Sequence, residues 1–181
     1  MKKTGTLRLY QHILEMLAVT LSPGLFFIGG GAIRDYILGR TALTKDIDLV
    51  LLSPTPSELE ACYKALRTLG YINEPSCFDD NPSSGNGSGD NAFCERWAGC
   101  FKWTHPTFPD LDLLVAHTDD IDELLDGFDF NINQYVLQVG DAHPRYLGVD
   151  EGRLTQLRPD GIPDERIQKM AALAIAHGWS L

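Results

Sequence analysis

The chain has 181 residues and a formal net charge of −10, from 15 lysines and arginines against 25 aspartates and glutamates, so its surface as a whole does not favour nucleic acid. Hydrophobic residues make up 44% and charged residues 22% of the sequence, which is typical of a single globular domain over residues 1–181 and excludes a disordered chain. No apolar run approaches the roughly 20 residues that cross a bilayer, and the start does not resemble a secretory signal, so we expect a cytoplasmic protein with no membrane partner.

The N-terminal half of the sequence alternates helix and strand signals. Apolar residues recur at intervals of three and four in the helical segments and form short unbroken runs in the strands. The helix with the clearest signals begins at a capping box, Thr55-Pro56-Ser57-Glu58, and ends at Gly70. In chain order, we expect helix, strand, helix, strand and helix over residues 7–21, 25–28, 32–38, 45–52 and 56–69.

The C-terminal half is predicted to be richer in strands. Residues 79–91 are polar and rich in glycine and serine, which predicts a flexible loop between two strands. An acidic helix is expected over 118–125. The expected strands cover residues 71–78, 92–103, 111–116, 130–139 and 145–149. The last helix, over 163–177, is expected to turn four side chains inward: Ile167, Met170, Ala174 and Ile175.

This order of elements indicates an α+β fold with a mixed β-sheet and helices packed mainly on one face of it. The four cysteines have none of the spacings of a zinc site, and we expect them to be reduced and mostly buried. They are Cys62, Cys77, Cys94 and Cys100.

A glycine-rich turn joins a strand to a helix at residues 28–35, which read Ile-Gly-Gly-Gly-Ala-Ile-Arg-Asp. Glycines at the start of a helix let backbone N–H groups approach a phosphate, and the helix dipole favours negative charge there. Arg34, one turn into the helix, adds a cation. For a glycine triplet alone, however, a tight structural turn without a ligand is the favoured interpretation.

Pairs of aspartates two residues apart open two of the expected strands. Asp46 and Asp48 project from one face of an apolar strand, and Asp110 and Asp112 do the same in a later strand. Like charges this close are costly unless a cation lies between them, and Mg²⁺ combines such carboxylates with phosphate oxygens and water. If the two strands are neighbours, Asp112 becomes a third ligand, preferred to Asp110 because it lies deeper in its strand. A solvated edge strand is the alternative for the first pair.

These features together resemble the catalytic head of the DNA polymerase β-type nucleotidyltransferase superfamily. The likeness is greatest to the branch that contains CCA-adding enzymes and bacterial poly(A) polymerases. Residues 30–40, GGAIRDYILGR, followed by Asp-Ile-Asp at 46–48, match the signature of that branch, GG-A-x-R-D-x-L-L-G-R … D-x-D, almost residue for residue.

A second motif of the same branch, R-R-D-F-T-I-N-A, corresponds to residues 127–134, which read GFDFNINQ. The Asp-Phe-x-Ile-Asn core is kept, whereas Gly127 and Phe128 replace both arginines. The resemblance covers roughly residues 5–155.

The resemblance implies a palm-like nucleotidyltransferase fold and a metal-dependent transfer of an NMP from an NTP, ATP or CTP, to an acceptor hydroxyl, with release of pyrophosphate. It implies that Asp46, Asp48 and Asp112 hold two Mg²⁺ ions, for which Mn²⁺ can substitute. It also implies that Asp112 orients or deprotonates the acceptor hydroxyl. The nucleotide-binding residues that it implies are Gly30, Gly31, Arg34, Asp129 and Asn133.

The acceptor is the open question. The branch carries a long C-terminal helical part that contacts RNA, and here one helix is expected after residue 160. No lysine or arginine lies between Lys102 and Arg145, an interval rich in aspartate. These features favour a small-molecule or protein acceptor over an RNA or tRNA 3′ end. The alternative from another class is a catalytically weak or inactive nucleotide-binding or interaction module on the same fold.

Overall fold

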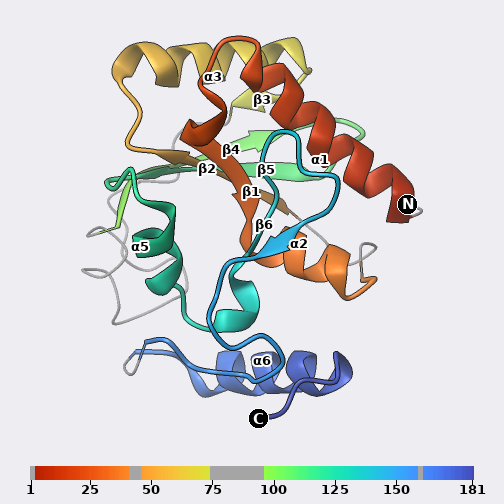
Figure 1. Ribbon diagram of the computed structural model, residues 1–181. Coiled ribbons are helices and arrows are strands. Elements are labelled where there is room, and N and C mark those ends of the chain that lie inside the picture. Colours follow the sequence, from red (N-terminus) through yellow and green to blue (C-terminus); the bar gives the residue numbers. More distant parts are fainter. Residues whose placement is uncertain (1–2, 41–45, 74–95, 159–160) are drawn as a thin grey trace.

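The computed structural model describes residues 3–40, 46–73, 96–158 and 161–181 (Figure 1). Its helices are α1 (Lys3–Ala18), α2 (Gly30–Ile37), α3 (Pro56–Thr68), α5 (Ile121–Asp126) and α6 (Asp164–Ala176), with short 3₁₀ helices at Pro23–Leu25 and Asn131–Asn133. Its strands are β1 (Phe26–Gly29), β2 (Asp46–Leu52), β3 (Ile72–Asn73), β4 (Trp97–Thr104), β5 (Asp110–Ala116), β6 (Tyr135–Val136) and β7 (Arg145–Tyr146). The loop expected over 79–91 lies outside the described residues, as do parts of the strands expected on either side of it.

Five of these strands form a mixed sheet in the order β1-β2-β5-β4-β3, in which β2 and β5 are parallel and the other pairs antiparallel. Strands β6 and β7 form a separate antiparallel pair. The α+β class and the mixed sheet expected from the sequence are therefore confirmed. None of the described helices combines the length and apolar character that spanning a bilayer requires.

The two faces of the sheet are covered unequally. Side chains that alternate along β2 and β5, such as Ile47, Leu49 and Leu111, enter the main hydrophobic core with residues of α1, α2, α3 and α6. The opposite face carries a smaller cluster around α5, in which Val50 and Leu124 are buried. Helices thus pack mainly on one face, as predicted, and the other face is left partly open near the beginning of β2 and β5.

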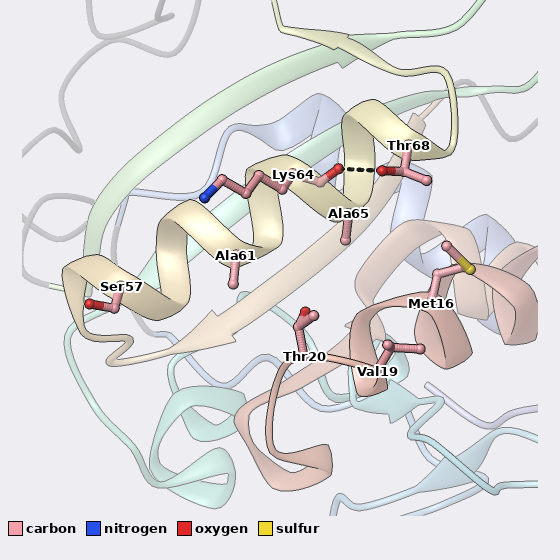
Figure 2. A pocket seen from close by; sticks show the side chains of 8 residues that line it. All are labelled: Met16, Val19, Thr20, Ser57, Ala61, Lys64, Ala65 and Thr68. Atoms are coloured by element: carbon pink, nitrogen blue, oxygen red, sulfur yellow. Dashed lines mark hydrogen bonds between the residues drawn. The ribbon is translucent and has the colours of Figure 1, made fainter.

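Helix α3 forms where its sequence signal places it. Thr55 accepts a hydrogen bond from the Glu58 backbone N–H at 3.3 Å, and the Glu58 carboxylate accepts one from the Thr55 N–H at 2.8 Å, so the predicted capping box is present. Between α3 and the end of α1, on the helical side of the sheet, lies a groove of about 430 Å³ (Figure 2). It is lined by Met16, Val19, Thr20, Ser57, Ala61, Lys64, Ala65 and Thr68.

Two expectations for the C-terminal half are wrong. The strand expected over 130–139 is instead a 3₁₀ helix followed by the two residues of β6. The strand predicted from the alternation of polar and apolar residues does not form, because Asn131 is buried. Its side chain forms hydrogen bonds with the backbone of Asp150, Arg153 and Thr155 at 2.8–3.1 Å. In α6, Met170 and Ala174 are buried as expected, whereas Ile175 is 61% exposed.

Candidate active site

The aspartates of β2 and β5 form a block on the open face of the sheet. In the parallel pairing of these strands, Asp46 lies opposite Asp110 and Asp48 lies opposite Asp112. Directly paired residues project from the same face, and this is the face opposite the core side chains of both strands. The structure therefore brings Asp112 to the same side of the sheet as Asp46 and Asp48, which are remote from it in sequence.

The electrostatics of this block show that its carboxylates are close. Burial, followed by the charges of Asp46 and Asp112, raises the pKa of Asp48 from 3.8 to about 7, although the Gly31 N–H and Arg34 act in the opposite direction. The pKa of Asp112 is also raised, by burial and then by the charge of Asp46. Asp110 is not among the groups that shift Asp48, so Asp112 is electrostatically the nearer partner.

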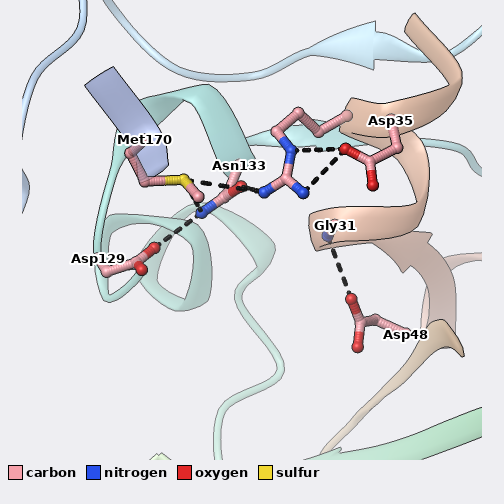
Figure 3. Close-up of polar contacts among 7 residues, drawn as sticks. Gly31, Asp35, Asp48, Asp129, Asn133 and Met170 are labelled. Atoms are coloured by element: carbon pink, nitrogen blue, oxygen red, sulfur yellow. Dashed lines mark hydrogen bonds and ion pairs between the residues drawn. The ribbon is translucent and has the colours of Figure 1, made fainter. Parts of the chain in front are cut away.

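The glycine turn approaches the same carboxylate from β1. Gly30 has a φ of +62°, and a Cβ atom added there would lie 2.6 Å from Oδ2 of Asp48, so both the backbone conformation and the close approach require glycine. The backbone N–H of Gly31 donates to Oδ2 of Asp48 at 3.2 Å (Figure 3). The start of α2, where the resemblance implies nucleotide-binding residues, is thus hydrogen-bonded directly to a side chain of β2.

Arg34 and the 129–133 segment form a buried polar network next to this turn. Arg34 is 5% exposed; its guanidinium donates to Oδ1 of Asp35 at 2.9 and 3.0 Å and to Oδ1 of Asn133 at 2.8 Å. The Asn133 amide in turn donates to Oδ1 of Asp129 at 2.8 Å (Figure 3). Arg166 of α6 completes the network, because its Nε donates to Oδ2 of Asp129 at 2.6 Å. Three of the predicted nucleotide-binding residues are therefore held together, mostly by one another.

The positions of the two missing motif arginines are filled by other side chains. A Cβ atom on Gly127 would lie 2.6 Å from Cδ of Arg96, whose guanidinium donates to the Gly127 carbonyl. Phe128 packs against the hydrophobic cluster around α5. Glycine at position 127 is thus explained by the packing of Arg96, a residue that precedes β4.

Lys102 and Arg166 are charged residues of this region that sequence reasoning missed. Lys102 lies directly opposite Asp112 in the antiparallel pairing of β4 with β5. The sequence could have indicated the position of Lys102. If the two strands form a hairpin around residues 105–109, residue 103 pairs with 111, and residue 102 then pairs with 112. Arg166 gave no comparable signal, because only the folded chain brings α6 to Asp129.

The donor set fits a hard divalent cation. No three His, Cys, Asp or Glu side chains in the part of the chain that the structure describes are gathered tightly enough to form a metal cage by themselves. Mg²⁺, however, is usually held by one or two carboxylates together with substrate phosphates and water. Asp46, Asp48 and Asp112 offer such oxygen ligands, and their mutual repulsion is what a cation would relieve.

Comparison with known proteins finds similar solved structures. No protein-family model and no curated protein matches the chain. A solved structure described as a tRNA-processing enzyme in its apo form is similar in fold, with a TM-score of 0.48 and 18% sequence identity. The similarity covers 92% of this chain and 35% of that one, so the chain spans about a third of the length of that enzyme.

Proposed function

We propose that this protein is a metal-dependent nucleotidyltransferase, which transfers an NMP from an NTP to an acceptor hydroxyl and releases pyrophosphate. The observation that carries this proposal is the register of β2 and β5, which sets Asp112 beside Asp48 on the face that the glycine turn also reaches. The sequence signature over residues 30–48 supports the same activity.

In the proposed reaction, the chain's own residues act mainly by positioning and by charge. The first turn of α2, which begins at Gly30, would direct backbone N–H groups that have no partner inside the helix toward the triphosphate, whereas the Gly31 N–H donates to Asp48. Arg34 and Asp129 fix Asn133 through hydrogen bonds, so that its segment keeps one conformation as the nucleotide binds.

The acceptor hydroxyl attacks the α-phosphorus, a new P–O bond forms, and the bond between the α-phosphorus and the bridging oxygen breaks to release pyrophosphate. Asp112, whose pKa is raised by burial, takes the proton of the hydroxyl. Mg²⁺ bound by Asp46, Asp48 and Asp112 would supply neutralisation of the charge that develops on the phosphate oxygens.

The test is transfer of label from NTP carrying a labelled α-phosphate, measured together with pyrophosphate release. The acceptor panel contains nucleosides, nucleotides, short RNAs and the protein itself. Replacing Asp46, Asp48 or Asp112 by asparagine should lower transfer at least about 100-fold, because each removes charge at the reacting phosphate. Asp119→Asn is the matched control, since Asp119 is exposed and outside the site.

The same experiment separates the alternative, a nucleotide-binding or interaction module without catalysis. Calorimetry with each NTP in Mg²⁺ measures binding independently of turnover. Tight binding by a wild-type chain that releases no pyrophosphate with any acceptor would favour the module and contradict the transferase.

A further inference from the structure

Lys102 is the single cation in an acidic stretch of the sequence. It is the only lysine or arginine between Arg96 and Arg145. Its neighbour Trp103 is fully buried in the main core, and alternation along β4 therefore turns Lys102 toward the open face of the sheet. There it is half-buried. Its charge acts on the carboxylate of Asp112, and among the residues that the structure describes its ammonium group takes part in none of the ion pairs.

The open face has a defined order across the sheet. The glycine turn lies at the β1 side of Asp48, Asp112 lies next to Asp48 on β5, and Lys102 follows on β4. A row of side chains therefore runs from the start of α2, through two carboxylates, to a single ammonium group.

The geometry of phosphoryl transfer assigns different substrates to the two ends of this row of side chains. The attacking and leaving oxygens lie roughly in line on opposite sides of the phosphorus. If the triphosphate lies toward the glycine turn at Gly30, pyrophosphate leaves on that side. The acceptor then approaches from the opposite side, over Asp112 and Lys102.

We propose that Lys102 binds a phosphate group of the acceptor, adjacent to the hydroxyl that attacks. The substrate class is thus a phosphate-bearing acceptor, either a nucleotide-like small molecule or the terminal phosphodiester of an oligonucleotide. This inference rests on the proposed function and extends it to the acceptor.

The chemistry at the acceptor end of the row explains why a cation is needed there. An acceptor phosphate at this end would lie near the carboxylates of Asp110 and Asp112, and the ammonium group of Lys102 would offset part of that repulsion. Lysine is a common phosphate ligand that acts as a compact point charge.

The test compares three acceptors that carry the same attacking hydroxyl: a nucleoside, its 5′-monophosphate and a trinucleotide with a free 3′ end. For the wild-type chain, kcat/KM should be at least about tenfold higher for one of the two phosphate-bearing acceptors than for the nucleoside, and which one it is separates the two sources. In Lys102→Gln this preference should fall to about one, through KM for the acceptor, while KM for the NTP stays unchanged. Lys102→Arg should keep most of the preference.

Lys64→Gln is the matched control, because Lys64 is exposed on α3 at the other face of the sheet. A wild-type chain that uses the nucleoside as well as the phosphate-bearing acceptors would overturn the proposal. An equal loss of kcat with all acceptors in Lys102→Gln would also overturn it, because it would mean that Lys102 acts only on Asp112 or on the fold.

Equilibrium binding tests the role of Lys102 independently of catalysis. A labelled trinucleotide and a labelled nucleoside 5′-monophosphate, both without the attacking hydroxyl, are titrated with wild-type and variant chains by fluorescence anisotropy at several salt concentrations. Lys102→Gln should weaken binding about tenfold and reduce the slope of log K against log salt by about 0.7, as for one single-strand phosphate contact. Unchanged affinity would refute the role of Lys102 even if no transfer is detected, whereas weakened binding without transfer would count against the nucleotidyltransferase alone.

Discussion

The charge on Asp48 should destabilise the fold when no cation is bound, so Asp48→Asn should make the protein more stable. Each pKa unit corresponds to about 1.4 kcal/mol, and a rise from 3.8 to about 7 therefore sets an upper limit of roughly 4 kcal/mol. Because the side chain is only partly buried, solvent screening reduces this figure, and we expect about 2 kcal/mol at pH 8. For a chain of this length that corresponds to a rise in Tm of about 4–8 °C.

The stabilisation by Asp48→Asn should depend on pH, because the pKa of Asp48 is higher in the folded state than in the unfolded state. Between pH 4 and pH 7 the folded state binds more protons at Asp48 than the unfolded state does, so stability falls as the pH rises through this window. At pH 4.5 the benefit of asparagine should not exceed about 1 kcal/mol. The assay is thermal unfolding with chelator at both pH values, with Asp119→Asn as the control. A variant less stable than wild type at pH 8, or a benefit equal at both pH values, would refute this reasoning.

Three further predictions concern the surroundings of Asp48. Gly30→Ala should lower the free energy of unfolding, measured in urea, by about 1–3 kcal/mol, and by more than Gly39→Ala does. Both glycines have positive φ, but only position 30 lies against a carboxylate. Equal losses in the two variants would contradict the close approach of Gly30 to Asp48. Arg166→Gln should cost about 1 kcal/mol in the same assay through the loss of its bond to Asp129, and no loss would show that the pair is neutral. The affinity for Mg²⁺ with a non-hydrolysable NTP should rise about tenfold from pH 6 to pH 8 in calorimetry, as Asp48 loses its proton, whereas a flat profile would count against its role as a ligand.

The acid block was predictable because it depends on local rules. Residues two apart in a strand share a face, and apolar neighbours such as Leu49 show that β2 is central rather than at an edge. The sequence shows a second strand that carries aspartates, but it does not show whether that strand pairs with β2. Only the folded chain establishes this pairing. The observed register sets Asp112 against Asp48, one strand away.

The polar network around Arg34 was not predictable in the same way. The resemblance implies that this cation binds the nucleotide, whereas in the fold its donors bond to Asp35 and Asn133. Long-range contacts of this kind depend on how the 3₁₀ helix Asn131–Asn133 and α6 pack against α2, and no local sequence pattern encodes this packing. The error over 130–139 has the same origin, since the buried amide of Asn131 is satisfied by a distant loop rather than by solvent.

The proposed function requires that the carboxylates of β2 and β5 hold a metal-bound triphosphate on the open face of the sheet. The most direct measurement is anomalous diffraction from crystals of the chain grown with Mn²⁺ and a non-hydrolysable NTP. We predict the strongest anomalous peak within coordination distance of Asp48 and Asp112, with the triphosphate extending from there to the glycine turn at Gly30 and Gly31. Manganese bound elsewhere, or a nucleotide bound on the helical side of the sheet, would contradict the proposed function.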